Sequence, residues 1–220
     1  MAHVSVRVLR ADDRVAVPWR NGGGRTREIA VGGADHDEFD WRVSLADIDR
    51  DGPFSGYSGY SRVISIVEGD GVELTVDGVT QRLDRRSAPF TFDGSAAVMC
   101  RLLSGPVRAL NVISRRSSDV EQVRPPSTSE IAAADTVVVV VVDGGAWLSV
   151  ESAGTAGSTV AVGDAAELAA HDAVLVDRRG DAGDDSGTVR LTPSVVGTEL
   201  AIVRVNVARP QASTRRHAVT

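Results

Sequence analysis

Short runs in which apolar and polar residues alternate follow one another along most of this chain. Alternation with a period of two, bounded by Gly, Pro, Asp or Ser, is typical of strands that bury one face. Asp77-Gly78 lies between two such runs, and this dipeptide is a strong signal for a β-hairpin. No stretch keeps an amphipathic helical period beyond three turns, although residues 131–135 and 164–170 could each form one helical turn. We therefore predict an all-β fold.

The predicted strands fall into two groups, separated by a polar segment that contains Pro125 and Pro126. The first group is expected at 4–9, 25–31, 39–45, 62–67, 72–76, 80–83, 90–92, 97–103 and 110–114. The second is expected at 136–142, 147–151, 159–162, 173–176, 188–191 and 200–207, with an acidic hairpin loop at 180–187. Two evenly spaced groups predict two β-barrels or sandwiches. The expected division is a first unit at 1–116, a linker or crossing segment at 117–130, a second unit at 131–210 and a tail at 211–220.

Composition and charge narrow the class of protein. Hydrophobic residues make up 42% of the chain but aromatic residues only 4%, and 22 Gly and 8 Pro suit many short strands joined by turns. The net charge of −6 argues against a nucleic-acid-binding protein, which normally carries a basic patch. The longest apolar run, 137–142, is far too short to span a bilayer, and the first residues lack the apolar core of a signal peptide. We expect a cytoplasmic protein without nucleic-acid or membrane partners, and a homodimer is an open alternative.

Metal-binding and nucleophilic motifs are not found in the sequence. Cys100 is the only cysteine and lies in an apolar run, so we expect a buried structural thiol. The four histidines are His3, His36, His171 and His217. They form no H-x-H or H-x-x-x-H pair, and no G-x-S-x-G motif is present. We therefore expect neither a metal nor a cofactor.

Residues 18–62 carry the densest set of polar and aromatic side chains. The run Gly22-Gly23-Gly24 has neither the spacing of a dinucleotide-binding fingerprint nor the Gly-Lys-Ser/Thr of a phosphate loop. Glycines let backbone approach a ligand or another strand, so a tight turn and a ligand contact both stay open. The chain contains no lysine, which excludes a Schiff-base lysine.

Arginines in this segment suggest an anion site. An arginine inside a barrel must be paired or must meet a ligand, because an unpaired buried charge is costly, and its planar fork suits carboxylates. Arg62 and Arg42 are predicted to pair with carboxylate oxygens, and Trp19 and Trp41 to form apolar walls. Structural salt bridges and plain core packing are the alternatives. The predicted ligand-binding residues, with Asn, Thr and Ser as hydrogen-bond partners, are Trp19, Asn21, Arg25, Thr26, Trp41, Arg42, Ser44, Ser55, Arg62 and Asn111.

Several of these segments resemble the HutD/Ves family, which is linked to bacterial histidine utilisation. The resemblance is carried by WRNGGGRTREIA at 19–30, FDWRVSLADI at 39–48, DGPFS at 51–55, Arg62, Gly69, Gly71 and LNVISRR at 110–116, and more loosely by 162–164 and 172–175. It implies a bicupin fold, two small β-barrels with terminal strands exchanged between them. It also implies a binding or regulatory protein without established catalytic activity, which senses a small carboxylate such as urocanate or formylglutamate.

Ordinary cupins bind a metal through H-x-H and a downstream Glu, whereas the corresponding stretch here offers Tyr57, Ser58 and Tyr60. We therefore predict a metal-free carboxylate-binding protein. One alternative is a metal-independent isomerase or hydrolase, with Glu28 or Asp47 as general base and Tyr57 or Tyr60 as acid. Another is a scaffold whose barrel is filled by its own side chains and whose surface binds a partner protein.

Overall fold

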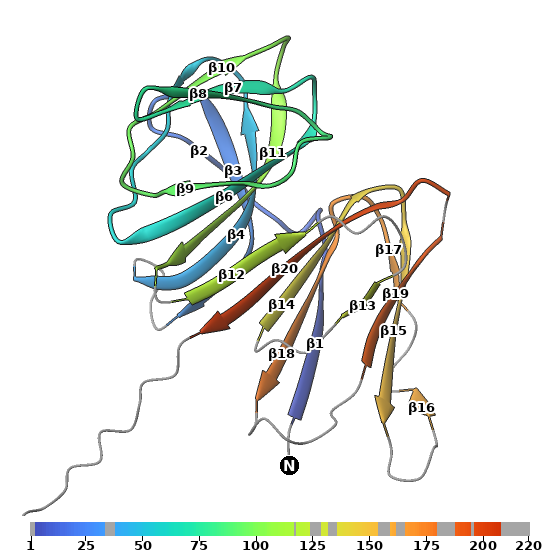
Figure 1. Ribbon diagram of the computed structural model, residues 1–220. Coiled ribbons are helices and arrows are strands. Elements are labelled where there is room, and N and C mark those ends of the chain that lie inside the picture. Colours follow the sequence, from blue (N-terminus) through green and yellow to red (C-terminus); the bar gives the residue numbers. More distant parts are fainter. Residues whose placement is uncertain are drawn as a thin grey trace, which may run out of the picture.

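The chain forms strands and no helix wherever the structure describes it (Figure 1). The computed structural model describes residues 3–33, 38–116, 118–123, 129–131, 136–153, 159–161, 166–179, 188–194 and 196–207. The strands are β1 (His3–Leu9), β2 (Ala16–Pro18), β3 (Gly24–Gly33), β4 (Phe39–Ile48), β5 (Gly52–Pro53), β6 (Tyr60–Glu68), β7 (Val72–Val76), β8 (Val79–Leu83), β9 (Phe90–Asp93), β10 (Val98–Leu102), β11 (Val107–Arg115), β12 (Ser118–Val123), β13 (Ser129–Ile131), β14 (Thr136–Asp143), β15 (Ala146–Ala153), β16 (Thr159–Ala161), β17 (Ala166–Leu168), β18 (Ala173–Arg179), β19 (Thr188–Pro193) and β20 (Glu199–Val207). The all-β prediction is confirmed.

The strands form four sheets, which we number in the order in which they stack. Sheet I has the order β5-β10-β7-β8 and sheet II the order β2-β3-β4-β11-β6-β9. Sheet III has the order β1-β18-β14-β20-β12, and sheet IV the order β13-β19-β15-β16, with β17 also paired to β15. Sheets I and II form the upper part of the molecule in Figure 1, and sheets III and IV the lower part.

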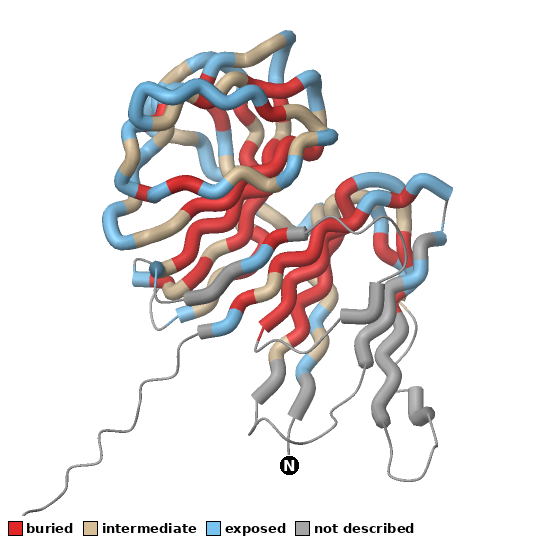
Figure 2. Tube along the Cα trace, viewed as in Figure 1, coloured by how far each residue is buried: buried red, intermediate tan, exposed pale blue. Residues whose placement is uncertain are grey.

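Three hydrophobic cores separate the four sheets. The largest lies between sheets II and III, where Trp41 of β4 belongs to the same cluster as Val140 of β14. A second core between sheets III and IV contains Ile202 and Leu148, and a third between sheets I and II contains Ile64. Figure 2 shows that buried residues dominate the central strands of sheets II and III. These two sheets are therefore covered on both faces.

The valine run at 137–142 shows how sequence pattern and position in the stack agree. Alternate side chains of a strand point to opposite faces of the sheet. Val138, Val140 and Val142 belong to the core between sheets II and III, whereas Val137, Val139 and Val141 belong to the core between sheets III and IV. Because β14 is buried on both faces, its sequence is continuously apolar rather than alternating.

The two groups of strands exchange an element at the N-terminus. β1 pairs with β18 in sheet III, with Val6 opposite Val176. The chain then crosses to β2 at the edge of sheet II. The first nine residues therefore belong, in space, to the second group of strands, in line with the strand exchange that the family resemblance implies.

The polar segment between the two groups contains a strand that the composition of the segment does not predict. β12 lies within the predicted linker and pairs with β20 at the edge of sheet III. Glu121 is exposed and pairs with Arg204, whereas Gln122 is buried and donates a hydrogen bond to Ser65 Oγ at 2.7 Å. An edge strand with few apolar side chains gives little alternation signal.

The predicted helical turn at 164–170 is wrong for residues 166–168, which form β17 and pair with β15. This strand, like β2 and β5, is only two or three residues long, so it has no readable periodicity. Its strand conformation is set by pairing with a neighbour that is distant in sequence.

Polar contacts of Glu68 and Arg108 with His171 join the two groups of strands at the junction of sheets II and III. Glu68 Oε1 of β6 lies 3.0 Å from Arg108 Nη1 of β11 and 2.8 Å from Nε2 of His171, which precedes β18. Asp47 of β4 accepts a hydrogen bond of 2.6 Å from Arg108 Nε. Burial, together with Arg108 and Arg14, lowers the pKa of His171 below its usual value, although Glu68 opposes this shift.

Some predicted features lie outside the described residues. They are His36, His217, residues 124–128, 132–135, 162–165 and 180–187 and the tail at 211–220. Within the described ranges, no helix is long and apolar enough to cross a membrane.

Candidate ligand-binding site

A cavity of about 370 Å³ opens beside the inner face of sheet II. Its floor comes from alternate residues of β4, β6 and β11, and its rim from the turn after β2 and the loop after β5. The lining residues are Pro18, Trp19, Arg20, Asn21, Ala46, Ile48, Pro53, Phe54, Ser55, Tyr57, Arg62, Ile64, Asn111 and Ile113.

The register between β6 and β11 determines how polar and apolar side chains are arranged on the floor of the cavity. Arg62 lies opposite Ile113, and Ile64 opposite Asn111, so the two polar and two apolar side chains form a diagonal pattern. The residues between them, such as Val63 and Val112, point to the other face and enter the core shared with sheet III. The two strands therefore carry the site on one face and the main core on the other.

Arg62 is the central charged group of the site. Its side chain is 7% exposed. Nη1 donates a hydrogen bond of 3.2 Å to the carbonyl of Ser55, and Nη2 donates one of 3.0 Å to Asn111 Oδ1. Its Nε has no hydrogen-bond partner, and no carboxylate among the described residues forms an ion pair with it. Burial lowers the pKa of Arg62 to about 10, so the guanidinium stays charged at neutral pH.

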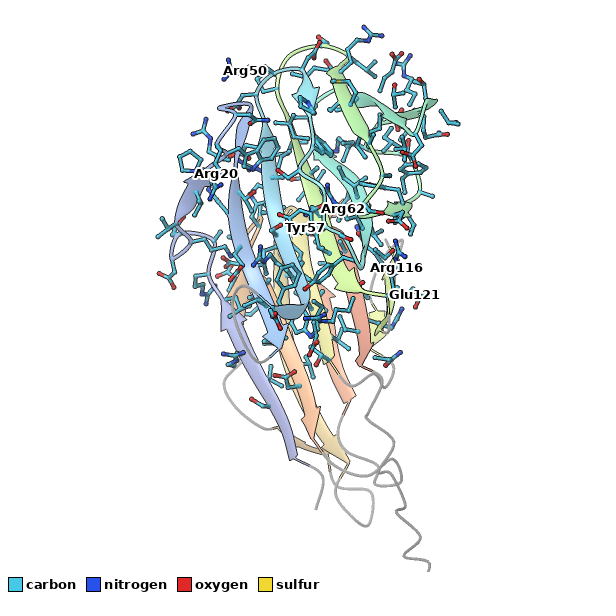
Figure 3. All side chains as sticks on the ribbon, turned by 90° about the vertical axis from the view of Figure 1, so that its left-hand side faces the viewer. Arg20, Arg50, Tyr57, Arg62, Arg116 and Glu121 are labelled. Carbon is cyan, nitrogen blue, oxygen red and sulfur yellow. The ribbon has the colours of Figure 1, made fainter. Side chains whose placement is uncertain are left out.

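Aromatic rings surround this guanidinium. The Arg62 Cζ atom lies 5.2 Å from the ring centre of Phe54, 5.7 Å from that of Tyr57 and 5.1 Å from that of Phe92. Cation–π contacts at these distances partly offset the loss of water around a buried charge. Figure 3 shows Tyr57 beside Arg62 near the middle of the molecule. These contacts hold the cation in place but supply no negative charge.

The glycine run forms the turn that positions Trp19. Trp19 Nε1 donates a hydrogen bond of 2.8 Å to Thr26 Oγ1. A Cβ atom on Gly24 would lie 2.1 Å from the carbonyl oxygen of Asp47 and 3.1 Å from the Trp19 ring, so only glycine fits there. Gly22 has φ of +65°, which favours glycine. These contacts support the interpretation of the glycine run as a tight turn.

Five of the ten predicted ligand-binding residues line the cavity. They are Trp19, Asn21, Ser55, Arg62 and Asn111. Asn21 also accepts a hydrogen bond from the amide of Gly23 at 2.9 Å, which fixes the rim turn. Ser55 contributes to the Arg62 contact through its carbonyl rather than its hydroxyl.

The other five predicted residues lie outside the cavity wall. Arg25 pairs with Asp49 at 3.1 Å, and Arg42 pairs with Glu28 at 3.2 Å. Trp41 is buried in the core between sheets II and III. Ser44 is buried opposite Asn111 in sheet II. Thr26 supports the site indirectly, because it accepts the Trp19 hydrogen bond.

Other lining residues were not among the predicted ligand-binding residues, including Arg20, Phe54 and Tyr57, of which Tyr57 was predicted only as a candidate acid in the alternative enzyme. Phe54 and Tyr57 belong to the Gly-rich loop that follows β5. Because this loop is largely polar, its serine side chain was predicted to bind the ligand and its aromatic side chains were not. Arg20 is adjacent to Trp19 in the same motif. It lies in a turn, where the alternation of apolar and polar residues does not tell which side chains face inward. The lining aliphatic residues read as ordinary core in the sequence.

The donor set of the cavity suits an anion and does not suit the metal of ordinary cupins. None of the lining residues carries a carboxylate, an imidazole or a thiol, which are the side chains that bind transition metals. No group of three or more His, Cys, Asp or Glu in the described ranges could hold a metal ion. The candidate bases Glu28 and Asp47 lie elsewhere, in ion pairs with Arg42 and Arg108.

Comparison with known proteins identifies the family. The HutD family model matches residues 11–187. This chain belongs to the HutD family. A 21.2 kDa Pseudomonas putida protein from the hutC 3′ region is 44% identical to it over 109 residues, which are 49% of this chain and 57% of that relative. Protein Ves of Citrobacter koseri is 38% identical over 131 residues, 59% of this chain and 68% of that protein. The HutD family is associated with histidine utilisation.

Solved structures agree with this HutD family assignment. HutD from Pseudomonas fluorescens SBW25, solved in a formate condition, is 30% identical, with a TM-score of 0.73 over 93% of this chain and 100% of its own. A conserved Pseudomonas aeruginosa protein of unknown function is 32% identical, with a TM-score of 0.74 over 92% of this chain and 99% of its own. More distant neighbours are cupin-like and share the fold alone, such as the Escherichia coli pirin YhhW at 10% identity and a TM-score of 0.56.

Proposed function

We propose that this HutD family member is a metal-free, regulatory binding protein of histidine utilisation that holds a small carboxylate in the cavity beside sheet II. We also propose that sheets I and II form one cupin barrel and sheets III and IV a second. The observation that carries the binding proposal is Arg62, a buried cation that opens onto a cavity and has no carboxylate partner among the described residues.

The buried positive charge of Arg62 favours a ligand of opposite charge. A buried charge without an opposite charge is costly, so proteins retain one mainly where a ligand completes it. Arg62 Nε has no hydrogen-bond partner, and the bond that Asn111 Oδ1 accepts leaves the Asn111 amide nitrogen as a further donor. A carboxylate has two oxygens that accept from such donors, and the cavity wall has no carboxylate that would repel it.

The size and walls of the cavity suit a small organic acid. A volume of about 370 Å³ lies at the lower end of ordinary ligand pockets. Trp19, Phe54 and Ile64 form apolar surface around the polar centre, which suits the carbon skeleton of such an acid. The association of the family with histidine utilisation supports formylglutamate or urocanate as the ligand. A scaffold filled by its own side chains is less favoured, because a cavity lies next to Arg62.

Calorimetric titration tests this proposal with urocanate, formylglutamate, glutamate, histidine and formate. We expect selective binding by the wild-type protein, and a loss of about 2–5 kcal/mol of binding free energy in Arg62→Gln, because a desolvated charge pair is broken. Arg82→Gln is the matched control, since Arg82 is exposed on β8 and outside the cavity wall. Equal affinity in a folded Arg62→Gln protein would exclude this cavity as the carboxylate site.

A further inference from the structure

The strand β2 is an edge of sheet II and exposes two valine side chains. It pairs with β3 on one side and is the last strand of the sheet on the other. Val15 is 79% exposed and Val17 is 61% exposed. Val17 lies opposite Thr26, which lies opposite Ala46 of the cavity wall, so all three side chains lie on one face of the sheet. Val15 is two residues earlier and points to the same face.

The backbone of this edge has hydrogen-bonding groups that face away from β3. The amide of Trp19 donates a bond of 2.9 Å to the carbonyl of Gly24, next to the paired residues of β2 and β3. Antiparallel strands bond through alternate residues, so Val17 bonds to β3 like Trp19, and the N–H and C=O of Ala16 face the open edge. Pro18 has no N–H, so a further strand is expected to pair at Ala16.

The centre of this edge carries no charged side chain. Charges usually protect an exposed edge strand from pairing with another chain. Residues 15–17 are Val, Ala and Val. The guanidinium of Arg14 is turned inward, where Nη1 donates a bond of 2.7 Å to the carbonyl of His171 and Nη2 one of 2.8 Å to that of Leu9. The edge is therefore apolar and open to a further strand.

We propose that β2 pairs with β2 of a second copy of this chain, antiparallel and about a two-fold axis at Ala16. Sheet II of the two copies then becomes one continuous sheet. Val15 of each copy lies opposite Val17 of the other, and all of these valines lie on one face, so the pairing covers apolar side chains that each copy exposes. This interface does not depend on the ligand of the cavity.

The turns on either side of β2 have opposite charges, which favours the antiparallel arrangement. Asp12 and Asp13 precede β2, and Arg20 follows it. All three are exposed, and none forms an ion pair with a described residue. Antiparallel pairing brings the acidic turn of one copy beside Arg20 of the other, and the two-fold axis repeats this contact. Parallel pairing would bring turns of like charge together. Figure 3 shows Arg20 near the outer edge of the molecule.

Sedimentation equilibrium of the full chain tests the pairing. An interface centred on one short strand is expected to bury less than about 1,200 Å², which is typical of weak complexes. The protein should therefore change from monomer to dimer between about 1 µM and about 1 mM, the range of weak dissociation constants.

Two variants of the edge should weaken the dimer. Val17→Glu places carboxylates within the apolar contact, and Ala16→Pro removes the outward N–H without removing a bond to β3. Each should raise the dissociation constant about tenfold or more, a loss of about 1.4 kcal/mol. Val79→Glu is the matched control, because Val79 is 73% exposed on β8, an edge strand of sheet I, and it should keep the wild-type dissociation constant. Thermal unfolding checks that each variant is folded.

Charge reversal tests the antiparallel direction. Arg20→Glu alone, or Asp12→Arg together with Asp13→Arg, should weaken the dimer about threefold at low salt, since exposed ion pairs contribute little. All three substitutions in one chain restore opposite charges across the interface and should restore the wild-type dissociation constant.

Four results would overturn the inference. A protein that stays monomeric up to about 1 mM would leave this edge to a different partner or to none. A dimer that persists unchanged in both Val17→Glu and Ala16→Pro would form through another surface. Equal weakening by Val79→Glu would show a general effect of charge. Failure of the combined charge reversal to restore the dimer would exclude the antiparallel arrangement.

Discussion

The two pairs of sheets differ in what fills their interiors. Between sheets III and IV the described interior is aliphatic, with residues such as Val139, Leu148 and Ile202 in close contact. Beside sheet II the corresponding space holds a cavity, a guanidinium and an amide, from Arg62 and Asn111. Both pairs are antiparallel and share the central core between sheets II and III.

This difference shows that the sheet architecture alone does not make the site. The inward positions of the central strands decide whether the space inside a sheet pair is filled or holds a cavity. A valine or isoleucine on the inner face fills space, whereas the Arg62 guanidinium needs hydrogen-bond partners and borders a cavity. The two pairs are joined through the core between sheets II and III.

The largest expected effect comes from truncating one isoleucine in each sheet pair. Ile202 and Ile64 are both 1% exposed, but only Ile64 borders the cavity. Ile202→Ala should lower the free energy of unfolding by about 2–5 kcal/mol, because it leaves a closed void. Ile64→Ala should cost less, because the space it leaves joins an existing cavity. Urea denaturation measures both costs.

Ligand titration sharpens the same comparison. Ile202→Ala should bind a carboxylate as the wild-type protein does, whereas Ile64→Ala should alter the affinity. Our assignment would be wrong if both variants lost the same free energy of unfolding and if folded Ile202→Ala also lost ligand binding. Both sheet pairs would then contribute to the site.

A second, smaller effect is expected from comparing Arg108, which forms ion pairs, with Arg62, which forms none with the described residues. Arg108→Met should lower the free energy of unfolding by about 1–3 kcal/mol, because Asp47 and Glu68 lose their shared partner in a part-buried place. Arg62→Met should cost less, because no carboxylate loses a partner and removal of a buried charge offsets the two hydrogen bonds lost at Ser55 and Asn111. Thermal unfolding without ligand compares the two. Strong destabilisation by Arg62→Met would assign Arg62 a structural role.

The smallest effect concerns the junction of the two sheet pairs at His171. Its pKa is lowered in the folded protein, chiefly by burial, so the unfolded chain takes up this proton at a higher pH. Stability from the neutral imidazole is therefore present above about pH 6.5 and is lost as pH falls below that value. Between pH 7 and 5 we therefore expect stability to fall as the unfolded chain binds this proton. His171→Gln should reduce the pH dependence of unfolding, and an unchanged profile would contradict this assignment.

Much of the fold could be predicted from the sequence, because exposed and buried faces alternate along long strands. All of the longer predicted strands are present among the described residues, from β1 to β20. The short strands β2, β5, β13 and β17 and the polar edge strand β12 were not predicted, since each is too short or too polar to show a clear alternation. Cys100 is buried, as its apolar surroundings predict, and burial raises the pKa of its thiol to about 12.

The lining of the candidate cavity was predicted in part. The sequence singled out Arg62, because an arginine inside a barrel must be paired or meet a ligand, and Trp19 as an apolar wall, and both line the cavity. The same role was predicted for Arg42, although Arg42 forms an ion pair with Glu28 outside the cavity. One-dimensional spacing cannot tell these two arginines apart, since both lie in strands of sheet II.

The sequence by itself determined the all-β class, the approximate position of most strands and the segment that supplies the site, because these follow from local alternation and residue chemistry. Tertiary structure alone decided that β1 joins sheet III, that Arg62 and Asn111 meet across β6 and β11, and that Trp41 faces the opposite core. The physical reason is that register and strand exchange depend on partners far apart in the chain. A cavity exists only where side chains from several strands leave space between them.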